Sequence, residues 1–166
     1  KRFAAFMHKA IPYPLVLIFT NGERICISMA EKRINQADKS KLVVVDRWMT
    51  DWFNPGKPTS AQSAFMEACA IQKLPSTNFF AFYEALQARV IELNTAGHTG
   101  FFEAAPVWVA KEQGEHLKEI ESLNREIAEL RVTLKKEKQM SRKIALNTEI
   151  RKRKDAIIKL EKSLTR

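Results

Sequence analysis

The final third of the chain is the feature that most constrains the fold. Residues 114–166 contain no proline and are rich in glutamate, lysine, arginine and leucine. These side chains lose little conformational freedom in a helix, so intrinsic propensity favours helix over the whole stretch. Apolar residues also recur at spacings of three and four, which places them on one side of a helix. The sequence therefore predicts a long coiled-coil-like arm with two groups of interface residues: Ile120, Leu123, Ile127, Leu130 and Leu134, followed by Ile150, Ile157, Leu160 and Leu164.

The two groups do not form one straight stripe. Ile127 and Ile150 are 23 residues apart, which separates them by roughly 140° around a single helix at about 100° per residue. Two arrangements are consistent with this offset: one helix that presents two faces, or an antiparallel hairpin that turns near residues 138–141. Ser141 is a suitable N-cap for a second helix, and a hairpin would let the two groups face each other. We therefore favour the hairpin, although neither glycine nor proline marks the turn.

The balance of charge points to a polyanionic partner. The chain carries a formal net charge of +9 and has a pI near 9.7, and such chains attract nucleic acid or acidic protein surfaces. The charge is concentrated in residues 135–154, which hold nine basic and two acidic side chains. A solvated basic helix needs no ligand, and this is the competing interpretation. The residues predicted to contact nucleic acid are Lys135, Lys136, Lys138, Arg142, Lys143, Arg151, Lys152, Arg153 and Lys154.

A β-hairpin is the clearest element of the first 110 residues. The run YPLVLIFT has strand length and consists largely of β-forming residues. Asn21 and Gly22 follow it, and this pair is typical of a tight hairpin turn because both positions tolerate positive φ. We expect the hairpin to span residues 13–30. A third antiparallel strand is predicted over KLVVVDRWMT, with residues 43–45 largely buried.

Helices are predicted on both sides of these strands in the sequence. The first, residues 2–9, ends before two prolines, which cannot continue it. Two more are expected over residues 61–72 and 78–93, and Gly97 lies just past the second, where a left-handed residue is favourable. We therefore predict an α+β domain over residues 1–110, with a small antiparallel sheet and flanking helices, followed by a basic helical arm or coiled-coil hairpin over residues 111–166. The apolar stripe of the 78–93 helix would be Phe79, Phe82, Leu86, Val90 and Leu93.

No motif indicates catalysis or a bound cofactor. The three histidines are widely separated, and Cys26 and Cys69 match no metal-ligand or redox spacing. No glycine-rich phosphate-binding loop or nucleophile motif occurs. We therefore expect neither metal nor cofactor, and a protein that is not an enzyme. The apolar run LVLIF is too short to cross a bilayer, so we expect a cytoplasmic protein without membrane contact.

A metal-dependent nuclease is the enzymatic alternative. Such enzymes use carboxylates at strand ends to hold Mg²⁺ against a phosphate. Asp46 follows the VVV run and Glu23 opens the return strand of the hairpin, but no Asp/Glu-x-Lys pattern on a strand completes a site. A surface or capping role for Asp46 is the favoured interpretation. Catalytic carboxylates of such an enzyme would lie upstream of Lys1.

Three segments are typical of one bacterial family: KAIPYPLVLIF at residues 9–19, FYEAL at residues 82–86, and KKEKQMSRKIALN at residues 135–147. Through them the chain resembles an uncharacterised family, a domain of unknown function, over nearly its whole length. The resemblance implies genes beside Swi/Snf-type helicases, DNA methyltransferases and restriction subunits. It also implies that members begin further upstream, in agreement with a first residue that is Lys1 rather than Met. It supplies no catalytic residues.

These observations predict a non-enzymatic accessory subunit of a bacterial DNA restriction-modification or phage-defence system. The expected partners are a helicase or methyltransferase subunit and DNA, the latter bound through the basic arm. The first alternative is an assembly module whose arm forms a homo-oligomer or pairs with another protein, without DNA contact. The second is a truncated nuclease-like domain whose catalytic residues lie upstream.

Overall fold

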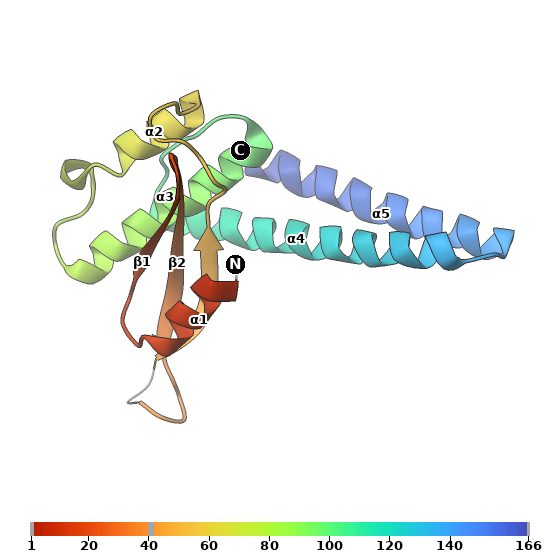
Figure 1. Cartoon of the computed structure of the whole chain (residues 1–166), viewed down its shortest axis with the longest axis horizontal. Coiled ribbons are helices and arrows are strands. Elements are labelled where there is room, and N and C mark those ends of the chain that lie inside the picture. The colour runs from red at the N-terminus through yellow and green to blue at the C-terminus, as the bar shows by residue number, and fades with distance from the viewer. Residues whose placement is uncertain (1, 40–41, 166) are drawn as a thin grey trace. The chain divides into compact units, whose positions relative to one another are not determined.

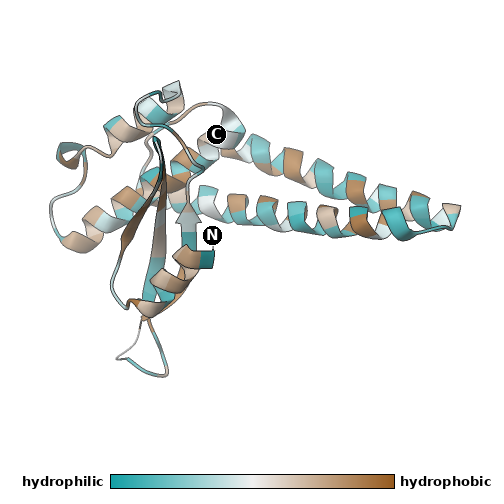
Figure 2. Ribbon diagram, viewed as in Figure 1, coloured by the Kyte–Doolittle hydropathy of each residue, from teal (hydrophilic) through white to brown (hydrophobic). Residues whose placement is uncertain are grey.

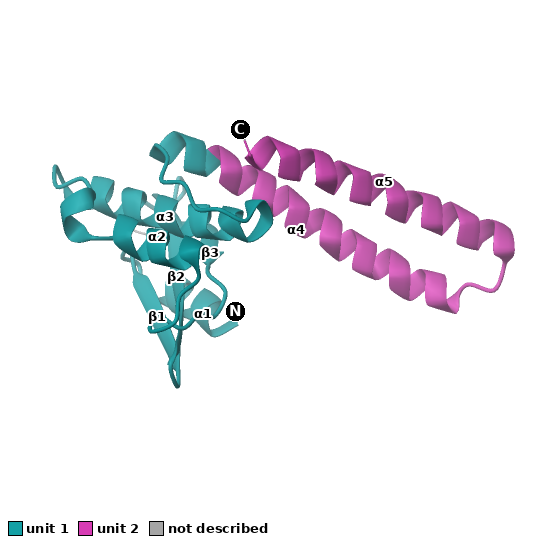
Figure 3. Ribbon diagram, turned by 90° about the horizontal axis from the view of Figure 1, so that it is seen from above, with its two compact units in different colours: residues 1–111 teal, residues 112–166 magenta. Residues whose placement is uncertain are grey.

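The computed structural model describes residues 2–39 and 42–165 of the chain. The chain divides into two compact units, Lys1–Lys111 and Glu112–Arg166, and the boundary falls within helix α4 (Val107–Lys136) (Figure 3). The first unit contains an antiparallel sheet with flanking helices, and the second is formed by two long helices. The predicted α+β class is therefore confirmed.

The sheet of the first unit is antiparallel. Gly22 adopts a φ of 59° in the turn after the first strand, a left-handed conformation that glycine accepts without strain, and the predicted hairpin is confirmed. The second strand is longer than predicted. It continues past Ala30, because its last residues pair with the third strand beyond a bulge after Glu31. The strands, in their order across the sheet, are β1 (Val16–Asn21), β2 (Arg24–Ile34) and β3 (Leu42–Met49).

Helices α2 (Ser60–Ala68) and α3 (Phe79–Thr99) build the main core with one face of the sheet. Successive residues of a strand point to opposite faces, and β2 directs Met29 toward α3. The Tyr83 hydroxyl of α3 accepts a hydrogen bond from the backbone N–H of Ala30 and lies within hydrogen-bond distance of the Ala30 and Leu15 carbonyls. Each fully buried apolar side chain contributes roughly 1.5–3 kcal/mol. The buried cluster consists of Met29, Phe53, Phe65, Tyr83 and Val90.

Helix α1 (Arg2–Ala10) covers the opposite face of the sheet (Figure 1). Its buried residues are Ala4 and His8, whereas Phe3 and Phe6 are exposed. The prediction that residues 43–45 are largely buried is wrong. Val43 and Val45 are 40% and 45% exposed, because β3 is an edge strand and its side chains have strand neighbours on one side only.

The ends of α3 differ from the prediction. Asn78 caps its start by accepting a hydrogen bond from the Ala81 N–H. The helix passes through Gly97 and ends at Gly100, which takes the left-handed conformation with φ of 85°. Phe79, predicted in the apolar stripe, is 83% exposed because it lies at the first position of the helix.

The second unit is a helical hairpin rather than one helix. Helices α4 and α5 (Met140–Leu164) run side by side in opposite directions (Figure 3). The Glu137 carboxylate accepts hydrogen bonds from the backbone N–H groups of Lys138 and Gln139, both at 2.8 Å. These bonds satisfy donors at the turn, and the Gln139 contact is the main reason that the pKa of Glu137 is lowered. Ser141 does not cap α5, whose N-cap position is Gln139.

The two apolar groups of the arm occupy the inner side of the hairpin. Ile120, Ile127, Ile150 and Leu164 are buried, and the other members of the predicted interface are half-buried. Hydrophobic and hydrophilic residues alternate along both helices (Figure 2), so each helix has an apolar and a solvated side. In the described ranges, no helix combines the length and apolarity needed to cross a membrane.

Candidate nucleic-acid interface

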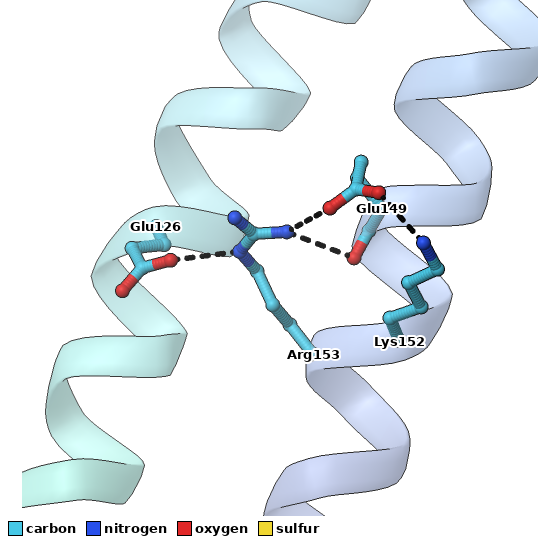
Figure 4. A network of polar contacts seen from close by, with 4 residues as sticks. All are labelled: Glu126, Glu149, Lys152 and Arg153. Atoms are coloured by element: carbon cyan, nitrogen blue, oxygen red, sulfur yellow. Dashed lines mark hydrogen bonds and ion pairs between the residues drawn. The ribbon is translucent and has the colours of Figure 1, made fainter.

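Three of the nine predicted nucleic-acid contacts are held in ion pairs within the arm. Arg153 extends from α5 toward α4, where its Nε atom lies 2.7 Å from Glu126 Oε2 and its Nη1 atom lies 2.8 Å from Glu149 Oε2 (Figure 4). Lys152 pairs with the same Glu149 at 3.1 Å. Arg142 lies 3.8 Å from Glu137. Of the three, Arg153 forms an ion pair with each of the two helices and so joins them.

The Arg153 contacts fix the register of the hairpin. Its bonds to Glu126 and Glu149 raise the pKa of the guanidinium, and the Arg153 and Lys152 contacts lower the pKa of Glu149. The Glu149–Arg153 pair has the i,i+4 spacing that favours such contacts and was visible in the sequence. The contact with Glu126 could not be predicted from the sequence, because it depends on the register between α4 and α5. Arg153 is therefore held by contacts within the arm.

Six of the predicted contacts form no ion pair with any residue that the structure describes: Lys135, Lys136, Lys138, Lys143, Arg151 and Lys154. Five of them are exposed and Lys143 is half-buried. They do not form a single basic face. Residues 151–154 are consecutive in a helix, so their side chains point outward at intervals of about 100°. Lys143 and Lys154, eleven residues apart, share one side of α5 to within about 20°.

That shared side borders a groove between the two helices. The groove has a volume of about 320 Å³ and an apolar floor contributed by both helices. Two cationic residues, Arg131 and Lys154, are among those that line it. Arg131 lies outside the dense basic run of residues 135–154 and is therefore not among the contacts predicted from the sequence. The residues that line the groove are Asn124, Ile127, Ala128, Arg131, Lys154, Ile157 and Ile158.

A buried histidine lies in the first unit, between α1 and the sheet. His8 Nε2 is 3.1 Å from Ser28 Oγ, and the two residues are 1% and 0% exposed. Burial lowers the pKa of His8, and the nearby positive charges of Lys32 and Arg47 lower it further. A histidine–serine contact is a feature of hydrolytic sites, but a substrate cannot reach this one. The pair therefore joins α1 to β2, and His8 Nδ1 has no hydrogen-bond partner among residues 2–39 and 42–165.

A second buried polar group connects α3 to the segment that follows it. Glu92, 2% exposed, accepts a hydrogen bond from the Ala105 N–H at 2.8 Å and pairs with Arg89 at 3.2 Å. Arg89 also donates to the Ala105 carbonyl. Burial raises the pKa of Glu92 to about 7, against the opposing effects of Ala105 and Arg89. Burial likewise raises the pKa of the nearby Cys69 thiol to about 11, so this cysteine is a poor nucleophile at neutral pH.

The carboxylates considered for a nuclease site do not converge in the structure. Glu23 accepts a hydrogen bond from the Asn54 amide at 2.9 Å. It lies just before β2 begins, whereas Asp46 pairs with Glu31 in the second half of that strand. Over residues 2–39 and 42–165, no group of three or more histidine, cysteine, aspartate or glutamate side chains is placed to hold a metal ion. His116 Nδ1 instead lies 3.2 Å from Ser163 Oγ, which connects α4 to α5.

Comparison with known proteins gives one match. The model of a family described as Domain of unknown function (DUF4391) matches residues 1–157. The match includes the first unit, the turn of the hairpin and all nine predicted nucleic-acid contacts. No curated protein and no solved structure matches the chain.

Proposed function

The chain belongs to the DUF4391 family, and we propose that it is a non-enzymatic accessory module whose basic arm binds the phosphate backbone of DNA. The observation that supports this proposal is a set of six cations in residues 135–154 that form no ion pair with the part of the chain that the structure describes. This segment carries a net charge of +7, out of +9 for the whole chain. Like charges at this density repel one another, and phosphates relieve the repulsion while they release bound counterions.

The turn of the hairpin is the strongest part of this surface. Lys135, Lys136 and Lys138 precede or lie in the turn, and Arg142 and Lys143 follow it within the first helical turn of α5. The one nearby carboxylate in this stretch of sequence, Glu137, is already bonded to backbone N–H groups. Basic side chains on several sides of a helical tip suit contact with phosphates, which fixes position without reading base sequence.

Fluorescence anisotropy with a short duplex of arbitrary sequence, measured across a salt series, tests the proposal. We expect binding that weakens steeply with salt and is similar for unrelated sequences. Replacing Lys135, Lys136 and Lys138 together by Gln should reduce the magnitude of the slope of log K against log[salt] by about 2 to 3. The matched control replaces Lys9, Arg24 and Lys57, three exposed cations of the first unit, by Gln.

The control removes the same charge but leaves the turn intact, so it should retain most of the slope. Equal losses in the two triple variants would mean that net charge rather than the turn is responsible. Binding that is absent or insensitive to salt would contradict the DNA proposal.

The wider role proposed for the module is in a bacterial restriction-modification or phage-defence system, in the cytoplasm. Its support is the family resemblance, whose members are expected beside helicase and methyltransferase genes. The arm would then contact DNA while the first unit, with its exposed Phe79 and Phe80, contacts the partner subunit. Co-expression with the neighbouring helicase or methyltransferase should give one co-eluting species on gel filtration. Separate elution at every salt concentration would contradict this role.

A further inference from the structure

Four basic side chains gather on the groove side of the arm, and none of them forms an ion pair with a residue that the structure describes. Arg131 and Lys154 line the groove itself. Lys135 follows Ala128 of the groove by seven residues, so it points within about 20° of the same direction around α4. Lys143 points within about 20° of Lys154 around α5. These four residues are called the groove cations below.

The acidic side chains of this part of the arm point in other directions. Residues 124–136 of α4 and 140–158 of α5 contain four of them: Glu126, Glu129, Glu149 and Asp155. Helical periodicity turns each one by at least about 100° from the groove cation of its own helix, Arg131 on α4 or Lys154 on α5. The groove side is therefore positively charged over this stretch, without a carboxylate beside it.

The cations that do form ion pairs lie away from the groove side as well. They point about 100–160° away from Lys154 around α5. Their partners are carboxylates of the same arm. The ion-paired cations are Arg142, Lys152 and Arg153. The hairpin thus has one side on which cations and carboxylates neutralise each other and another side, at the groove, on which the cations lack partners in the chain.

Two contacts between the helices set the register of the hairpin. Arg153 lies beside Glu126, and Ser163 lies beside His116. Both contacts place Lys154 about one residue beyond Glu126, toward the start of α4. The backbone of Lys154 is therefore about 9 Å from the level of Arg131 along the arm.

Arg131 and Lys154 extend toward each other across this distance. Long side chains on a helix lean toward its N-terminus, and the two helices run in opposite directions (Figure 3). Both side chains therefore lean toward the level of Ala128, which also lines the groove. Asn124 lines the groove too, and its amide can donate a hydrogen bond. Two converging cations and an amide donor suit one anion bound between the helices.

The groove cations extend further than a single anion. By the same register Lys143 is level with about residue 136 of α4, beside Lys135, so the four residues span about 16 Å along the arm. A DNA strand carries one charge per 3.4 Å of its axis, and it therefore presents more than one phosphate over this length. The apolar residues of the groove, Ile127 and Ile157 among them, limit the access of water and so strengthen the attraction.

We propose that the DNA backbone runs along the groove side of the arm, with one phosphate bound between Arg131 and Lys154. Neighbouring phosphates, toward the turn, contact Lys135 and Lys143. This inference rests on the proposed DNA binding and extends it from the turn into the groove. It adds one contact, Arg131, that lies outside the basic run, and it directs the DNA along the arm.

The salt dependence of duplex binding in a double variant, Arg131→Gln with Lys154→Gln, tests the inference. The slope of log K against log[salt] should fall in magnitude by about 2, because two phosphate contacts are lost. The matched control is Arg125→Gln with Lys159→Gln. It also removes one exposed cation from each helix, and both residues point at least about 100° away from Lys154 or Arg131 around their helices. The control should retain most of the wild-type slope.

The outcomes separate this inference from the proposed function. Equal losses in the two double variants, whether large or small, would overturn the groove contact. If the variant of Lys135, Lys136 and Lys138 still lowers the slope in that case, DNA binding at the turn stands without the groove. A wild type that binds no DNA would overturn both proposals. Circular dichroism verifies that the variants keep the helical content of the wild type.

Acetylation of the lysines of the wild-type chain locates the DNA without any substitution. The chain is treated with acetic anhydride alone and with saturating duplex, and the modified lysines are identified by mass spectrometry. Lys143 and Lys154 should lose most of their reactivity when DNA is bound. Lys152 and Lys159, on other sides of α5, should react equally in both samples. Equal protection of Lys154 and Lys159, or no protection of Lys154, would contradict the proposed path.

Discussion

At the scale of single residues, two of the titratable groups that the first unit buries, His8 and Glu92, make the stability depend on pH in opposite directions. Their neighbours explain the difference. His8 is surrounded by the cations Lys32 and Arg47, which disfavour its charged form. Glu92 is buried beside Arg89, and its burial outweighs the attraction of that cation. The hydrophobic interior thus favours the neutral form of both side chains.

Glu92 should make the chain less stable as the pH rises. Its folded-state pKa of about 7 lies above the reference value of 4.5, so the folded state binds the proton more tightly than the unfolded state. The stabilisation is fully present below pH 4.5 and is lost as the pH rises through about 7, by about 3 kcal/mol at most. His8 has the opposite sign, because its lowered pKa gives a contribution that is present above pH 6.5 and lost in acid.

Urea unfolding of the wild type and of Glu92→Gln, each from pH 4.5 to 8, measures the Glu92 contribution. The glutamine oxygen can still accept from the Ala105 N–H, but the side chain does not titrate. The difference in unfolding free energy between the two proteins should therefore change with pH, and the His8 contribution cancels in that difference. Parallel profiles would show that Glu92 does not titrate in this range.

At the scale of secondary-structure elements, two glycines define where α3 ends. Gly97 lies within the helix, and a Cβ atom added there would meet nothing within 4 Å. Gly100 ends the helix with φ of 85°. Alanine reduces the entropy of the unfolded chain at both positions, but only at Gly97 is the native backbone conformation favourable for it.

Gly97→Ala should therefore stabilise the first unit by about 0.5–1 kcal/mol, and Gly100→Ala should destabilise it by about 1–2 kcal/mol. Thermal and urea unfolding of the two variants measures the difference, and each is the control for the other. If α3 instead ended at Gly97, just past the helix predicted from the sequence, Gly97→Ala would destabilise the first unit.

At the scale of the whole molecule, the two units bury apolar surface in different ways. The first unit buries a mixed core under the sheet, and the second buries one apolar seam and leaves its charges exposed. The arm carries the proposed contact with DNA at its turn, and the first unit carries the proposed contact with a partner subunit.

The secondary-structure elements could be predicted from the sequence better than their exact ends or the exposure of their side chains. The hairpin was readable because Asn21 and Gly22 impose a turn regardless of context. The arm was readable because propensity and periodicity act locally. The end of α3 could not be predicted in this way, because either Gly97 or Gly100 could have adopted the left-handed conformation that ends the helix. The exposure of Val43 could not be predicted either, because it depends on which strand lies at the edge of the sheet.

The basic residues of the candidate interface likewise have some properties that the sequence determines and others that depend on the tertiary structure. Their number and concentration in residues 135–154 are properties of the sequence alone, as are the α+β class and the two apolar stripes of the arm. Only the tertiary structure decided that the arm folds back on itself at Glu137, that Arg153 is held by Glu126, and that Arg131 joins Lys154 at a groove. The physical reason is that charge and periodicity add up along the chain, whereas ion pairs and grooves require residues far apart in sequence to come together.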